Sequence, residues 1–278
     1  MKLKNGYIPE NSIFITKDPR KNRWAIPFHY EAVNVRAQTL LDENIEHIKG
    51  KRILDLGCHF GTFSYIALQL GAEFVLGVDS SVDLIKQAKE MFTASSVPED
   101  KYDFIIQDVI KYLENLSEKS FDTILCFGLL YYIPDNYHFL KLLKKAAKDA
   151  IIIDTFTAYY SLIQGKDAVE ANSIIKDDIF KLPVMMHSLT QAKKKYYSLP
   201  GSFKGQNKKL SFLSCPTIPL LELYFKSLGF KFRQLDWSQY LKNPQKNWQD
   251  LTSSQGKIDS HWTDLYSTDV RVSYLLNL

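Results

Sequence analysis

Two acids and two glycines in the first third of the chain have the types and the spacing needed to bind a nucleoside. Asp55, Gly57 and Gly61 form an acid-x-Gly-x-x-x-Gly pattern, and Asp79 follows after a further apolar run. Glycines let backbone amides approach a ligand closely, and a carboxylate at this distance can accept hydrogen bonds from both ribose hydroxyls. The run from Gly57 to Gly61 lacks the second and third glycines of the GxGxxG fingerprint, so binding of a pyrophosphate-bearing dinucleotide is disfavoured.

The elements that must position these residues follow a repeating order of strand and helix. Apolar runs predict buried strands at residues 53–56, 74–78, 102–108, 121–127 and 150–154, and amphipathic patterns predict helices at 83–92 and 137–147. Further along, a helix is expected from Pro216 and Thr217 to Gly229, followed by strands at 230–236 and 270–276. This alternation indicates an α/β fold with a parallel sheet that is covered by helices on both faces.

The acid and glycine pattern, together with the order of the later elements, resembles the class I S-adenosylmethionine (SAM)-dependent methyltransferases over residues 45–278. The resemblance implies a Rossmann-like seven-stranded methyltransferase sheet, mostly parallel with an antiparallel last strand. It also implies that the chain binds S-adenosyl-L-methionine and releases S-adenosyl-L-homocysteine (SAH). His59 departs from the family, which usually has glycine at this position, so we expect His59 to narrow the pocket or to touch the cofactor.

The same resemblance implies a set of cofactor contacts at the ends of the strands. Asp79 would bind the ribose, Asp108 or a neighbour would bind the adenine amino group, and the loop at residues 128–132 would face the methyl-donor sulfonium. The expected cofactor-binding residues are Asp55, Gly57, Cys58, His59, Gly61, Asp79, Ser80, Gln107, Asp108, Val109 and Phe127.

The length and composition favour one domain that spans residues 1–278, with 45% hydrophobic residues to fill its core. Within it we expect an amino-terminal cap at residues 1–44 and two substrate-lid insertions, at residues 156–214 and 237–268. Loops at the carboxyl ends of strands bind ligands in open α/β sheets, and connections this long are generally functional. Substrate identity is therefore expected to depend on the insertions.

Methyl transfer to a hydroxyl requires alignment of the acceptor and removal of its proton. Histidines in the expected lid regions and polar residues near the predicted methyl-donor position are the candidates for this role. They are His29, His187, His261, Tyr131 and Asp154. A lone histidine also fits a purely structural role, so the general base stays open.

Charge and cysteine content narrow the functional classes. The formal net charge is +4, and lysines spread over helix faces disfavour a dedicated nucleic-acid-binding surface. Residues 193–197 combine lysines with tyrosines and could hold a phosphate or a stacked base. The cysteines have no CxxC spacing, which indicates neither a disulfide framework nor a metal site. No apolar run is long enough to predict a membrane span, and a cytoplasmic protein is expected.

These features predict an enzyme that transfers a methyl group from SAM to a small-molecule acceptor, at an oxygen of a sugar, phosphate-bearing or other polar metabolite. Residues 121–135 and 210–230 also resemble a branch that includes tRNA wobble-uridine carboxymethyltransferases and bacterial small-molecule methyltransferases, so methyl or carboxymethyl transfer to tRNA is one alternative. A SAM-fold binding module without catalysis is the other, and His59 is its only support. The acceptor, the atom methylated, the pathway and the oligomeric state stay open.

Overall fold

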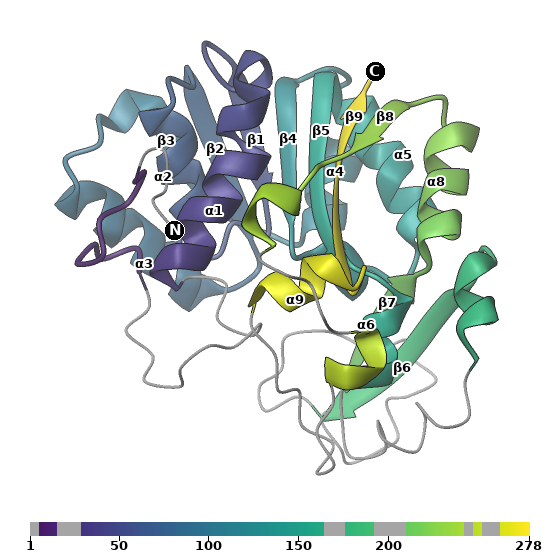
Figure 1. Cartoon of the computed structure of the whole chain (residues 1–278). Helices are drawn as coiled ribbons and strands as arrows, with labels where there is room; N and C mark the ends of the chain where they lie inside the picture. The colour runs from purple at the N-terminus through teal and green to yellow at the C-terminus, as the bar shows by residue number, and fades with distance from the viewer. Residues whose placement is uncertain (1–5, 16–28, 164–175, 192–209, 242–246, 252–261) are drawn as a thin grey trace.

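The structure is a computed structural model, and it describes residues 6–15, 29–163, 176–191, 210–241, 247–251 and 262–278. A seven-stranded sheet forms its centre (Figure 1), with the strands in the order β3-β2-β1-β4-β5-β9-β8. The bounds in that order are Tyr102–Ile106, Phe74–Asp79, Arg52–Leu56, Phe121–Phe127, Ala147–Phe156, Arg271–Asn277 and Lys231–Gln234. The first five strands are parallel, and β9 runs antiparallel to both of its neighbours. The predicted fold class, a mostly parallel methyltransferase-type sheet, is confirmed.

Helices cover both faces of this sheet, as the sequence pattern predicts. One face carries α1 (Tyr30–Leu40), α2 (Thr62–Gln69) and α3 (Val82–Ala94), and the other carries α4 (Val109–Asn115), α5 (Asn136–Ala146) and α8 (Ile218–Ser227). Successive strand side chains point to opposite faces, so Ile53 packs with the first set of helices and Leu54 with the second. Two apolar cores, one on each side of the sheet, therefore hold the strand ends in place.

Short 3₁₀ turns complete the connections. They are η1 (Asp42–His47), η2 (Glu99–Lys101), η3 (Leu130–Tyr132), η4 (Asp177–Lys181), η6 (Ser238–Tyr240) and η7 (Trp248–Leu251). No helix among the described ranges is long and apolar enough to cross a bilayer.

The third strand is shorter than predicted, because Asp108 begins a helix that the sequence analysis did not predict. The strand ends at Ile106, and the Asp108 side chain accepts hydrogen bonds from the backbone amides of Ile110 and Lys111, at 3.0 and 3.1 Å. A carboxylate that satisfies the first free amides of a helix is a typical N-cap. The fifth strand is longer than predicted and extends over both ends of residues 150–154.

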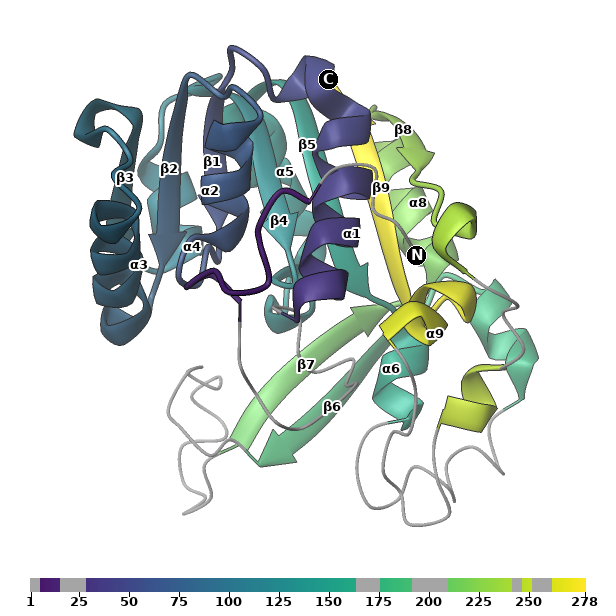
Figure 2. The ribbon, with the colours of Figure 1, turned by 60° about the vertical axis from the view of Figure 1, so that its left-hand side comes forward.

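The first insertion contains regular structure that its loop-like sequence did not reveal. After α6 (Ala158–Ile163), strands β6 (Met185–Gln191) and β7 (Leu210–Pro216) pair in an antiparallel ribbon separate from the main sheet. Figures 1 and 2 both show this ribbon beyond the carboxyl ends of the parallel strands. The ribbon therefore stands where a wall of the ligand site is expected.

The aromatic residues of the second insertion are packed inside the protein. Trp237 stacks on Tyr266 with ring centres 3.7 Å apart, and Trp248 packs against Tyr159 and Phe180. Trp237 and Trp248 are each 5% exposed. Tyr266 belongs to α9 (Trp262–Ser267), which leads directly into β9. These aromatics therefore stabilise the fold around the carboxyl edge of the sheet.

Candidate active site

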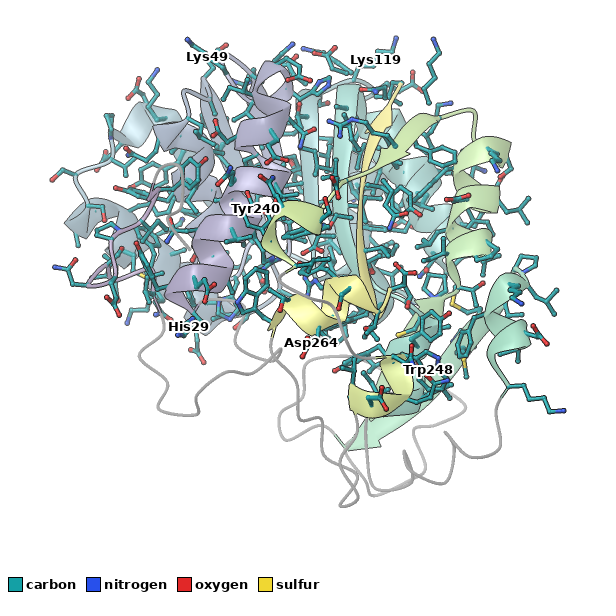
Figure 3. All side chains as sticks on the ribbon, viewed as in Figure 1. His29, Lys49, Lys119, Tyr240, Trp248 and Asp264 are labelled. Atoms are coloured by element: carbon teal, nitrogen blue, oxygen red, sulfur yellow. The ribbon has the colours of Figure 1, made fainter. Side chains whose placement is uncertain are left out.

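The predicted cofactor-binding residues lie at one edge of the sheet, where the parallel strands end. In Figure 3, Lys49 and Lys119, which precede β1 and β4, lie at the edge opposite to His29 and Asp264. The ends of β3, β2, β1 and β4 are neighbours in the sheet, and Asp79 at the end of β2 pairs with Ile106 on β3. Residues far apart in the chain therefore meet at the carboxyl edge, where open α/β sheets bind ligands.

The turn between β1 and α2 depends on glycine at two positions. Gly57 and Gly61 have φ values of +67° and +79°, a conformation that side-chain-bearing residues rarely adopt. A Cβ at Gly61 would also lie 2.8 Å from the rings of Phe104 and Phe92. The Gly57 amide donates to the Val78 carbonyl oxygen at 2.8 Å, which ties the turn to β2. The turn is thus held tightly beside the residue that is expected to bind ribose.

His59 adopts the conformation of the glycine that it replaces. Its φ is +55°, and its backbone amide donates to Oδ2 of Asp79 at 3.1 Å. The imidazole lies edge-on to Phe60, with ring centres 4.4 Å apart. Burial lowers the pKa of His59 to about 4. The ring is therefore neutral at physiological pH and adds no positive charge to the turn.

The lowered pKa of His59 predicts a specific loss of stability in acid. Between about pH 6.5 and pH 4 the unfolded chain protonates this histidine while the folded chain does not, so stability falls as the pH falls. Across this window, we expect the free energy of unfolding of wild type to fall by about 2 kcal/mol relative to that of His59→Asn. This value is reduced for solvent screening, because part of the ring is exposed. Urea unfolding of both proteins at steps from pH 7 to pH 4 measures the difference.

The asparagine variant is the matched control, because asparagine tolerates a positive φ and all other titrating groups stay in place. The comparison also cancels the contribution of Asp55 to the pH dependence of stability. The pKa of Asp55 is raised to about 6, so this group makes the folded state more stable as the pH falls. A stability difference between the two proteins that does not change with pH would show that His59 is not held neutral.

Asp79 is oriented by backbone amides and keeps acceptor capacity for a ligand. Oδ1 accepts from the Ser81 amide at 2.9 Å, and Oδ2 accepts from the His59 amide. Each carboxylate oxygen has two lone-pair directions, so both can still accept a hydroxyl proton. Burial raises the pKa of Asp79, while the amides oppose that effect. Ser80 beside it is exposed.

Two apolar side chains next to Asp79 were missed by the sequence analysis. Val82 is 60% exposed at the start of α3, and Ile106 is 50% exposed at the end of β3. Exposed apolar groups beside a carboxylate that is expected to bind ribose suit the faces of a flat purine. The position of Ile106 beside Asp79 depends on the pairing of β2 with β3, which no local sequence pattern reveals.

The other residues expected at the adenine end differ in accessibility. Gln107 is half-buried, and its backbone amide donates to the backbone carbonyl oxygen of Asp79 at 3.0 Å. Asp108 is exposed. One oxygen of Asp108 caps α4, and the other has no hydrogen bond to the described residues. Val109 is 8% exposed and packs in the core, so its side chain is poorly placed to meet a ligand.

Asp55 and Cys58 lie beneath the turn. Asp55 is 3% exposed and accepts a hydrogen bond from the Ser64 hydroxyl at 2.6 Å, and burial raises its pKa to about 6. Burial also raises the pKa of the Cys58 thiol, which fits a small packing residue better than a nucleophile. Phe127, at the end of β4, packs edge-on against Phe63 of α2 with ring centres 5.2 Å apart.

The loop after β4 brings a tyrosine and an arginine together. A Cβ on Gly128 would lie 3.3 Å from the Tyr131 hydroxyl and 3.6 Å from Nη2 of Arg271, so both groups border this glycine. The Gly128 amide donates to the Asp154 carbonyl oxygen at 2.8 Å. Tyr131 is among the predicted site residues and Arg271 is not, because β9 reaches this edge only through the antiparallel pairing with β5.

Asp154 is a buried counterion, and this argues against the expected role as a general base. It is 0% exposed and accepts hydrogen bonds from Arg36 and Arg271, each with a shortest distance of 2.7 Å, and from Tyr266 and Ser273. Burial alone would raise the pKa of Asp154, but the two arginines outweigh it and lower the pKa to about 2. A carboxylate with this pKa is a poor proton acceptor at neutral pH.

The histidine candidates lie on separate elements. His29 is exposed at the start of α1, and His187 is exposed on β6 with its Nδ1 3.0 Å from the Ser214 hydroxyl. His261 lies outside the described residues, so its expected role as a base stays a prediction.

Taken together, a glycine turn and strand-end acids at the carboxyl edge of a seven-stranded α/β sheet are typical of a protein that binds a nucleoside cofactor. A family model described as a methyltransferase domain matches residues 47–206, which is more than half of the chain. The chain therefore belongs to the methyltransferase-domain family, in its SAM-dependent class. S-adenosylmethionine is the cofactor, as the sequence predicts. The acids at the carboxyl edge suit the hydroxyls of its ribose, and the glycines allow the cofactor to approach the backbone of the turn closely.

Individual relatives agree with this assignment. The chain is similar to a tRNA U34 carboxymethyltransferase from Pseudomonas syringae pv. syringae, with 26% identity over 216 residues that cover 76% of this chain and 56% of that protein. The chain spans about half the length of the curated relatives it matches. Its fold is similar to a SAM-dependent methyltransferase from Mesorhizobium loti (15% identity, TM-score 0.53, covering 88% of this chain and 100% of that one). It is also similar to the amino-terminal domain of EvdMO1 determined with SAH and D-fucose (16% identity, TM-score 0.54, covering 87% and 81%).

Proposed function

We propose that this methyltransferase acts on a small polar acceptor at an oxygen atom, and that the acceptor carries an anionic group such as a carboxylate or phosphate. The observation that supports this most is the position of Arg271 and the Tyr131 hydroxyl beside Gly128, in the loop expected to face the methyl donor. Arg271 is 6% exposed and already pairs with Asp154, which also pairs with Arg36. Two arginines against one carboxylate leave an excess positive charge, and this excess favours an anionic group on the acceptor.

The surroundings of this pair suit a small acceptor. Arg271 lies 4.8 Å from the centre of the Phe156 ring, which stacks on Tyr160 at 3.9 Å. Tyr131 packs against the same two rings. Aromatic walls with a few polar groups are typical of small-molecule pockets. The β6–β7 ribbon stands beyond this edge and would limit access by water (Figure 2).

The catalytic demand on the protein is mainly one of positioning. When bound, the cofactor supplies an activated methyl carbon that an acceptor oxygen attacks in line. The Tyr131 hydroxyl would orient that oxygen through a hydrogen bond, Arg271 would hold the anionic group, and the aromatic walls would exclude water. His29, His187 and His261 are still the proposed bases for removing the acceptor proton.

Transfer to tRNA is the second candidate, because a curated relative similar to this chain is a tRNA U34 carboxymethyltransferase. The basic cluster at residues 193–197, which would contact the phosphates, lies outside the described residues. If tRNA is the acceptor, affinity for tRNA should fall steeply with added salt and on neutralising Lys193, Lys194 and Lys195.

The test follows the radiolabelled methyl group of SAM into a desalted metabolite extract and into total tRNA, beside titrations with SAM and SAH. We expect label in metabolites that an anion-exchange resin retains. Tyr131→Phe should lower turnover about tenfold or more with little change in SAH affinity, because a neutral hydrogen bond to the acceptor is lost. Tyr137→Phe, which alters an exposed tyrosine on α5, is the matched control.

Other outcomes separate the alternatives. Label confined to tRNA, with a steep salt dependence of binding, would favour the tRNA enzyme. Absence of SAM and SAH binding would favour the non-catalytic module. Equal turnover of Tyr131→Phe and wild type would remove Tyr131 from the proposed acceptor site.

A further inference from the structure

Large apolar side chains stay exposed on the face of the molecule that carries α5 and α8. Tyr137 on α5 is 37% exposed, Leu223 on α8 is 48% exposed, and Leu182, directly after η4, is 55% exposed. Figure 1 shows α5 and α8 side by side. A single exposed leucine needs no explanation, but apolar side chains that gather on one face indicate a contact surface.

Contacts between the elements join these three side chains into one surface, which we call the α8 face. The rings of Tyr137 and Tyr224 pack edge-on with centres 5.2 Å apart, which joins α5 to α8. The hydroxyl of Thr217, at the start of α8, donates to the carbonyl oxygen of Leu182 at 2.6 Å. The end of η4 is therefore fixed beside the first turn of α8.

Neither the core nor the carboxyl-edge site uses the α8 face. On α8, Leu221 and Phe225 are 0% exposed and fill the core, while Leu223 between them points outwards. By contrast, the exposed side chains of Val82 and Ile106 lie beside Asp79, where the cofactor is expected. The exposed apolar groups of the α8 face therefore have no partner in the proposed reaction.

Charges of both signs border this apolar surface. Glu222 and Lys226 stand on either side of Leu223 along α8, with side chains 33% and 66% exposed, and their own contact is loose at 3.9 Å. On η4, Asp178 and Lys181 form a pair that is largely exposed. A surface for nucleic acid or for an anionic membrane needs an excess of cations. An apolar centre with a rim of both signs fits a protein partner instead.

The order of the charges along α8 points to a second copy of this chain as that partner. In a two-fold contact both copies use the same surface, so a residue i that meets j is matched by j meeting i. If two α8 helices cross antiparallel beside Leu223 and Tyr224, Glu222 of each copy lies opposite Lys226 of the other. The two Leu223 side chains then meet at the centre. We propose that the protein forms a two-fold dimer through the α8 face.

The first test measures the mass of the protein in solution by sedimentation equilibrium, at concentrations from about 1 to 100 μM. The mass of wild type should rise to that of two chains and no further, because a two-fold contact is closed. Leu223→Glu should weaken the dimer by about 30-fold or more, since two like charges replace the central apolar contact. Ile13→Glu is the matched control, because Ile13 is 53% exposed and its neighbour Phe14 packs in the core on the other face of the sheet.

The second test exchanges the charges and reports on the geometry. Glu222→Lys and Lys226→Glu each place like charges opposite one another twice, so each should weaken its own dimer by about tenfold or more. An equimolar mixture of the two variants should recover the dimer. In the mixed pair every lysine at these positions lies opposite a glutamate of the other chain. Recovery is therefore specific to a contact in which position 222 meets position 226.

Thermal unfolding checks that each variant is folded. Glu222→Lys also loses the hydrogen bond from the Tyr274 hydroxyl, at 3.2 Å, so this variant is the one most at risk. If it fails to fold, Leu182→Glu replaces it, and Leu182→Glu and Lys226→Glu should each weaken the dimer while Ile13→Glu does not.

Distinct results would overturn the inference. A wild-type mass of one chain at all concentrations would exclude the dimer. A dimer that Leu223→Glu and Leu182→Glu leave unchanged would use another surface. A mass that rises beyond two chains, or a mixture that associates no better than the separate variants, would contradict the two-fold crossing of α8.

Discussion

Replacing Asp154 with asparagine is expected to lower the free energy of unfolding by about 3–5 kcal/mol, the largest effect that the structure predicts. Asp154 is fully buried and pairs with Arg36 and Arg271, which are 5% and 6% exposed. Neither arginine can become neutral, so the substitution leaves two buried cations without a counter-charge. The hydroxyls of Tyr266 and Ser273 lose their charged acceptor as well.

Urea unfolding at neutral pH measures this loss. The control is Asp149→Asn, which breaks the ion pair with Lys51 at the surface, where the Asp149 side chain is 39% exposed. We expect the control to lose less than about 1 kcal/mol. An equally small loss in Asp154→Asn would mean that solvent reaches the arginines and that the pair is not truly buried.

The pH dependence of the stability that Asp154 contributes provides an independent check. Its pKa is lowered to about 2, below the value of about 3.8 in the unfolded chain, so the unfolded state binds more protons between these values. The stabilising contribution is complete above about pH 4 and is lost as the pH falls towards 2. The two arginines stay charged throughout, so the change is due to the carboxylate.

Replacing Asp79 with alanine is expected to weaken SAM and SAH binding by about 1.5–3 kcal/mol, the largest effect expected on cofactor affinity. Both carboxylate oxygens keep acceptor capacity beyond their bonds to the Ser81 and His59 amides, and this capacity suits two ribose hydroxyls. Alanine removes both acceptors. Isothermal titration with each cofactor measures the loss.

Asp103→Ala is the matched control for this prediction, because Asp103 is an exposed acid on neighbouring β3. Its side chain lies 3.9 Å from Lys89 and accepts a hydrogen bond from the backbone amide of Phe104 at 2.7 Å. Its affinity for SAM should equal that of wild type. Thermal unfolding of both variants checks that the turn is intact, since Asp79 also receives the His59 amide. Unchanged affinity in folded Asp79→Ala would exclude Asp79 from the ribose site.

The sequence alone was sufficient for the parts of the fold and site that depend on local patterns. Runs of apolar residues identified β1, β2 and β4 because strands buried on both faces need them. The acid and glycine spacing located the turn because only glycine takes a left-handed conformation cheaply at Gly57 and Gly61. His59 was recognised as a departure, but its φ of +55° and its bond to Asp79 were not predictable.

Only the tertiary structure decided which charged and aromatic groups meet. Arg36, Asp154 and Arg271 come from α1, β5 and β9 and are separated by more than a hundred residues along the chain. The insertion of β9 between β5 and β8 brings Arg271 to Asp154 and turns the expected base into a counterion. A sequence states the charge of a side chain but not its neighbours, and at a buried site the neighbours set its pKa and its role.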